Sequence, residues 1–61
     1  METLARDLTP GARIRRPGGG TWTVTRVQPE DNGEVAISVK HERTGDQDVF
    51  WTWGHRPVEE A

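Results

Sequence analysis

The chain contains no cysteine, only one serine, and no long run of apolar residues. The absence of cysteine excludes disulfides and thiolate metal sites, so a reducing compartment is no obstacle to folding. No segment approaches the roughly 20 apolar residues that cross a bilayer. Residues 1–4 also lack the basic start and apolar stretch of a signal peptide. These absences predict a cytoplasmic protein that does not engage a membrane.

The small size of the chain limits it to one domain. A domain of about 60 residues buries only roughly 60% of the surface that its unfolded chain exposes. Apolar residues make up 31% of the chain and charged residues 30%, a balance that by itself leans towards disorder. The apolar residues are, however, β-branched and aromatic and occur in blocks. We therefore predict one folded domain over residues 1–61, with residues 1–9 and 59–61 loosely ordered and a short helical turn around Leu4 and Leu8.

Most of the chain divides into short blocks in which apolar and polar residues alternate. Such alternation is typical of strands that have one face in water. The clearest block directs Val35, Ile37 and Val39 to one side. Glycine and proline mark the turns between blocks, including an Asn32-Gly33 hairpin signal. The predicted strands cover residues 11–16, 21–27, 34–40 and 48–53, with a short stub near residue 58.

Along the second predicted strand, the apolar residues change from even-numbered to odd-numbered positions. Trp22 and Val24 share a face, whereas Val27 falls on the opposite one. A bulge or sharp bend near Thr25–Arg26 would direct all three side chains inward. Bends of this kind let a small sheet curl on itself.

The segment 48–53 holds two of the three tryptophans and the only phenylalanine. In so small a chain these rings are expected to form much of the core, with the earlier strands wrapped around them. Trp51 and Trp53 share one face with Val49, and Phe50 lies on the other. Two alternatives follow: either the N-terminal turn covers Phe50, or one of the rings lies exposed.

Four to five short strands joined by tight turns predict an all-β fold, a small antiparallel barrel that is closed or half-closed. The stretch 8–15, in which Pro10-Gly11 leads into a strand, is followed by Gly20–Val24 and Val27. This arrangement resembles the opening of small SH3-like barrels, and the likeness spans about residues 8–53. Small bacterial and phage-encoded proteins often have this organisation. The resemblance implies a binding module and names no ligand.

Residues suited to catalysis are scarce. Ser38 and His41 lie three apart on an extended segment, so their side chains diverge. The two histidines and the nearby carboxylates lack the spacing of a zinc-finger site. Gly18–Gly20 is not followed by the Lys-Ser/Thr pair and the helix of a phosphate-binding loop. We therefore predict a protein that is not an enzyme and has no catalytic residues, no metal and no cofactor.

The aromatic side chains point to protein binding. Tryptophan is enriched at interface cores because it buries a large area with few torsions to freeze. We predict that Phe50, Trp53 and Trp22 bind an unidentified protein partner, and that the protein acts as an adaptor. The alternative is that all four rings fill the core, in which case an edge strand could still pair with a partner strand. An open edge could also pair with a second copy, so we expect a monomer or a weak homodimer.

The uneven distribution of charge suggests a second function. The net charge is −2, but residues 11–28 carry four arginines and no acid, a charge of +4, whereas residues 29–61 carry eight acids against three bases, a charge of −5. The basic segment could bind nucleic acid, with Trp22 nearby for stacking. Few basic groups are present, enough for at most about four phosphate contacts. Alternatively, they could pair with Glu34, Asp48 or the acidic tail. The candidate nucleic-acid-binding residues are Arg13, Arg15, Arg16 and Arg26.

Overall fold

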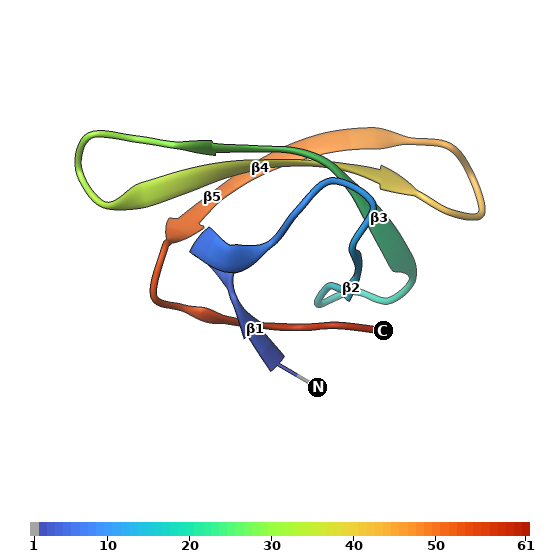
Figure 1. Ribbon diagram of the computed structural model, residues 1–61. Coiled ribbons are helices and arrows are strands. Elements are labelled where there is room, and N and C mark those ends of the chain that lie inside the picture. Colours follow the sequence, from blue (N-terminus) through green and yellow to red (C-terminus); the bar gives the residue numbers. More distant parts are fainter. Residues whose placement is uncertain (1) are drawn as a thin grey trace.

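A computed structural model describes residues 2–61 as an all-β chain with two antiparallel sheets (Figure 1). The smaller sheet pairs β1 (Glu2–Leu4) with β6 (Pro57–Glu59), and a 3-10 turn, η1 (Ala5–Asp7), follows β1. The prediction of an all-β, antiparallel fold is confirmed. The larger sheet has the order β2-β3-β4-β5, and its strands are β2 (Arg13–Arg15), β3 (Thr21–Pro29), β4 (Glu34–His41) and β5 (Gln47–Trp53).

The meander of β3, β4 and β5 follows the predicted alternation. On β4, Val35, Ile37 and Val39 point into the core and are at most 3% exposed. The register between β3 and β4 shifts between Val24 and Arg26. This shift is a bulge, and it lies where the sequence predicted one from the positions of the apolar residues. Because of this bulge, side chains on both halves of the long strand β3 pack against the same core.

The core is aliphatic, so the prediction that the strands wrap around the aromatic segment 48–53 is wrong. That segment forms β5, an edge strand of the sheet, and only its Phe50 packs against the core. Residues from η1 and the segment after it, and from β2, β3 and β4, meet beneath the sheet. The buried residues are Ala5, Leu8, Ile14, Val24, Val35, Ile37 and Val39.

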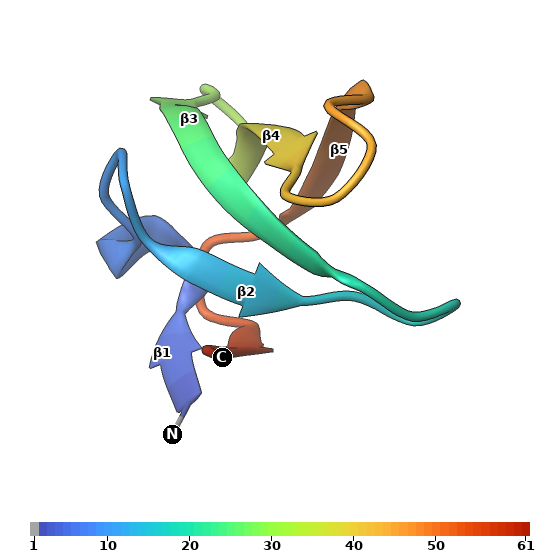
Figure 2. The same ribbon diagram turned by 90° about the vertical axis from the view of Figure 1, so that its right-hand side faces the viewer.

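The smaller sheet brings the two ends of the chain together (Figures 1 and 2). Thr3 Oγ1 donates a hydrogen bond of 2.7 Å to a Glu60 carboxylate oxygen, and the Ala61 N–H donates one of 2.9 Å to the Arg13 carbonyl. Loose order over residues 1–9 and 59–61 stays a prediction, and Met1 lies outside the described residues. Strands of three residues carry no alternation that could have revealed this pairing. The helical turn predicted around Leu4 and Leu8 is only the three-residue 3-10 turn η1, and the two leucines flank it with extended backbone.

The strands do not close into a barrel. The two sheets join at a bridge between Ile14 and Glu60. Within residues 2–61, β5 pairs with β4 alone and β6 pairs with β1, so the two strands leave a gap between them (Figure 2). No helix among these residues is long and apolar enough to cross a membrane.

Candidate functional site

The outward face of β5 carries three neighbouring apolar side chains that are exposed to solvent. Val49, Trp51 and Trp53 are 43%, 60% and 46% exposed. Trp51 lies opposite Ala36 on β4, and Val49 lies opposite Ser38. These partners are too short to shield a large neighbour across the strands. We call Val49, Trp51 and Trp53 the outer stripe.

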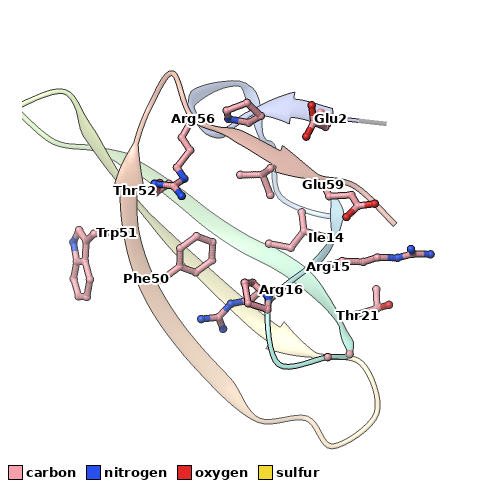
Figure 3. A pocket seen from close by; sticks show the side chains of 15 residues that line it. Glu2, Ile14, Arg15, Arg16, Thr21, Phe50, Trp51, Thr52, Arg56 and Glu59 are labelled. Atoms are coloured by element: carbon pink, nitrogen blue, oxygen red, sulfur yellow. The ribbon is translucent and has the colours of Figure 1, made fainter.

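The inward side of β5 borders a cleft of about 870 Å³ between β5 and the strands β2 and β6. Figure 3 shows Phe50 pointing into this cleft from β5, whereas Trp51 points away from it. Ile14 and Arg56 also line the cleft. The two faces of β5 therefore border different surroundings: an open aromatic surface on one side and a partly apolar cleft on the other.

Arg16 covers one end of the cleft by packing between two rings. Its guanidinium carbon lies 4.7 Å from the centre of the Phe50 ring and 4.9 Å from that of the Trp22 ring, both within cation–π range. Its Nη1 also donates a hydrogen bond of 2.9 Å to Asp48. The Arg16 guanidinium, followed by the Val49 backbone N–H, lowers the pKa of Asp48 below its ordinary value of 3.8. Arg16 is thus held by β3 and β5 together.

The four predicted nucleic-acid-binding arginines do not act as one free group. Arg13 makes a two-pronged contact with Glu42, at 2.6 and 3.0 Å, and this hydrogen-bonded arginine lowers the pKa of Glu42. Arg16 packs between two aromatic rings and donates a hydrogen bond to Asp48. Among the residues that the structure describes, Arg15 and Arg26 form no ion pair, and both are exposed. The sequence predicts Asp48 as one alternative partner for these arginines, whereas it does not predict the pairing of Arg13 with Glu42.

The three predicted protein-binding residues lie in different places. Trp53 belongs to the outer stripe, where its ring stacks on His55 with ring centres 6.4 Å apart. Phe50 and Trp22 are half-buried, and both rings contact the guanidinium of Arg16. The sequence missed Trp51, the most exposed of the large apolar residues. Trp51 and Trp53 are two residues apart and therefore share a face of the strand, but this spacing alone does not say which face points outward.

Trp22 packs edge-on against His41, with ring centres 4.8 Å apart. The Nδ1 atom of His41 accepts hydrogen bonds from the backbone N–H groups of Arg43 and Thr44, at 3.0 and 3.2 Å. These bonds hold the imidazole at the turn that joins β4 to β5. Ser38 lies three residues before His41 on β4, opposite Val49. Within residues 2–61, no group of three or more His, Cys, Asp or Glu is placed to hold a metal ion.

The Arg16–Asp48 contact predicts how stability depends on pH. A carboxyl whose pKa is lowered by folding stabilises the native state above its unfolded pKa and loses this contribution as the pH falls through its folded pKa. Stability should therefore decrease between about pH 5 and about pH 2, and Asp48→Asn should flatten part of that decrease and lower stability at pH 7. Urea unfolding of both proteins at several pH values measures this.

The matched control for that measurement is Asp46→Asn. Asp46 lies in the same exposed segment and belongs to neither of the two ion pairs found among the described residues. Its replacement should leave the pH profile close to that of the wild type. Equal profiles for the Asp48→Asn and Asp46→Asn proteins would contradict a role for the Arg16–Asp48 contact.

Comparisons of the chain with protein-family models, with curated proteins and with solved structures found no match. The function is therefore inferred from the geometry of β5 and its surroundings.

Proposed function

We propose that this protein is a small, non-catalytic binding module that contacts a partner protein through the outer stripe of β5. The observation that carries the proposal is the exposure of three adjacent large apolar side chains, between 43% and 60%, on one sheet face. Contiguous exposed apolar surface on a small domain marks interaction sites. Tryptophan is also the residue most enriched among those that dominate binding energy.

An SH3-like arrangement is the finer fold that we propose. The Pro10-Gly11 turn before β2, the bulge in β3 and the 3-10 turn η1 support it. Proteins of this architecture mostly bind other molecules, which agrees with a module that offers an exposed strand face. The open gap between β5 and β6 is the feature that departs from a closed barrel.

Nucleic-acid binding is the second candidate. Arg15 and Arg26 support it, because both are exposed on β2 and β3 and are free of ion pairs within residues 2–61. The engagement of Arg13 with Glu42 and of Arg16 with Asp48 weakens it. Two free arginines offer about two phosphate contacts, so the affinity would be low and strongly dependent on salt.

The outer stripe predicts a large effect of Trp51→Ser on partner binding. The protein is used as bait in the cells that produce it, and the captured protein is then purified and titrated against each variant. Truncating a central aromatic residue should weaken binding by at least about 30-fold, since such residues contribute about 2 kcal/mol or more. Trp53→Ser should have an effect in the same direction.

The control variant is Arg15→Ser, which changes an exposed residue on another strand of the same sheet. Protein binding through the outer stripe requires that Arg15→Ser leave the affinity nearly unchanged. Titrations with short single-stranded and duplex oligonucleotides at about 50 and about 200 mM salt test the second candidate. Salt-sensitive binding that Arg15→Ser weakens and Trp51→Ser spares would replace protein binding with nucleic-acid binding.

A further inference from the structure

The free edge of β5 presents a defined set of backbone groups. At one end of the β4–β5 ladder the His41 N–H donates to the Asp46 carbonyl at 2.7 Å, and at the other the Gly54 N–H donates to the Gly33 carbonyl at 3.0 Å. Hydrogen-bonded positions alternate along an antiparallel ladder. The even-numbered residues of β5 therefore bond to β4. The odd-numbered residues direct their N–H and C=O groups towards the free edge, and these residues are Gln47, Val49, Trp51 and Trp53.

Some of these edge groups already have partners within the chain. The Val49 N–H donates to the Asp48 carboxylate at 2.9 Å. The Trp53 carbonyl accepts a bond of 3.0 Å from the Arg56 N–H. Over the stretch 49–53, four groups remain without a partner among the described residues: the Val49 carbonyl, the Trp51 N–H, the Trp51 carbonyl and the Trp53 N–H.

This pattern of free groups is complementary to itself. We propose that two copies of the chain pair through β5, antiparallel, about a twofold axis that passes through Trp51. Each Trp51 N–H then donates to the partner's Trp51 carbonyl, and each Trp53 N–H donates to the partner's Val49 carbonyl. Every free group meets a free group of the opposite kind. The two groups that are already bonded, the Val49 N–H and the Trp53 carbonyl, also fall opposite each other.

Neighbouring registers do not give this match. A twofold axis at Val49 would set each free Val49 carbonyl against an N–H that Asp48 already holds. An axis at Thr52 would set the free Trp51 N–H against the partner's Trp53 carbonyl, which Arg56 already occupies. An axis at Phe50 would leave the Trp51 carbonyl facing the bonded Val49 N–H. Buried polar groups without partners are costly, so the Trp51 register is favoured.

The side chains of β5 permit this contact. The strand has no lysine, no proline and no bulge, which are the devices that keep edge strands apart. Its one charged residue, Asp48, is already paired with Arg16 and would lie opposite the partner's Gly54. On the outer face Trp51 would lie beside the partner's Trp51, and Val49 beside the partner's Trp53. Pairs of this kind stabilise antiparallel strands.

The cleft offers room on the other side of the edge. Phe50 and Thr52 point towards it, and Arg16 closes only the end near Asp48 (Figure 3). Because the strands would run antiparallel, the partner's Arg16 would lie at the opposite end of the joined clefts. The two four-stranded sheets would become one continuous sheet. The two outer stripes would then lie side by side on one face.

The test measures self-association of the full chain, which at this length is accessible to chemical synthesis. Sedimentation equilibrium between about 10 μM and about 1 mM covers the range expected of a small interface. We expect a monomer–dimer equilibrium. N-methylation of the Trp51 amide removes the central donor of both copies but keeps the indole ring. It should weaken the dimer by at least about tenfold, since two hydrogen bonds are lost.

Two further variants keep the test decisive. N-methylation of Asp31, an exposed turn residue, is the matched control and should leave the dimer intact. Trp51→Lys brings two like charges together at the axis and should give a monomer with an unchanged circular dichroism spectrum. A monomer at about 1 mM would overturn the proposal, as would a dimer that survives both changes at Trp51. The proposal is independent of the partner protein proposed above, because N-methyl-Trp51 keeps the ring that would bind that partner.

Discussion

Replacing Ile37 with alanine should lower the free energy of unfolding by about 2–5 kcal/mol. Ile37 is fully buried at the centre of β4, between Val27 on β3 and Phe50 on β5. Truncation removes buried methyl groups and leaves a cavity, because neighbours on both strands are held by the ladder. A domain of this size has a total stability of roughly 3–9 kcal/mol, so this one change removes a large part of it.

Urea unfolding followed by circular dichroism measures the loss. The urea concentration at the midpoint of unfolding should fall, while the dependence of the unfolding free energy on urea concentration should stay the same. The melting temperature should drop by at least about 10 °C. The control is Val49→Ala on β5, where the side chain is 43% exposed and the expected loss is under about 1 kcal/mol. Similar losses for the two variants would contradict the placement of the core on the Ile37 side of the sheet.

Replacing Gly20 with alanine should cost about 2–4 kcal/mol. Gly20 has a φ of +87°, which strains any residue with a side chain. A Cβ atom there would also overlap Nε2 of His41. The imidazole cannot move aside freely, because its Nδ1 accepts the two backbone bonds from Arg43 and Thr44. The substitution therefore combines backbone strain with a steric clash.

Gly19→Ala separates these two effects. Gly19 has a φ of +100°, and a Cβ atom there meets nothing within 4 Å, so only the strain of about 1–2 kcal/mol is expected. Combining Gly20→Ala with His41→Ala should recover the steric part, which a double-mutant cycle reports as a coupling of at least about 1 kcal/mol. Equal costs for the two glycine substitutions, or zero coupling, would show that the imidazole does not lie against Gly20.

The alternation of residue types was sufficient to locate the meander. On β4 the three buried positions, Val35, Ile37 and Val39, are aliphatic, and the residues between them are smaller or polar, so a single register satisfies both faces. The bulge in β3 was also predictable. Val24 and Val27 have opposite parities, and only an extra residue between them lets both contact the core.

The orientation of β5 could not be predicted in the same way, because both of its faces carry aromatic rings. The choice depends on the space left beneath the sheet, which the residues of β4 and the buried Ala5 and Leu8 already fill. One ring, Phe50, fits there under the side chain of Arg16. Trp51 and Trp53 are left outside. That outcome depends on the packing of segments that are distant in sequence. The alternation of residues within one strand carries no information about such packing.

The arginines illustrate the same limit. Their clustering in residues 11–28 was plain in the sequence, as was the excess of acids in the second half. Which acid meets which arginine depends on the order of strands in the sheet. Glu42 follows β4 and reaches Arg13 only because β2 and β4 both flank β3. Sequence spacing alone gives no access to such contacts.

The pairing of β1 with β6 bears on the order in which the chain folds. The contacts among β3, β4 and β5 link neighbouring strands through short turns, so forming them closes only small loops. The β1–β6 pair joins Glu2 to Glu59 and closes a loop of nearly the whole chain. Loop closure grows costlier with length, so this pair is expected to form after the meander. The same order implies that transient opening begins at the joined ends of the chain and reaches the meander last.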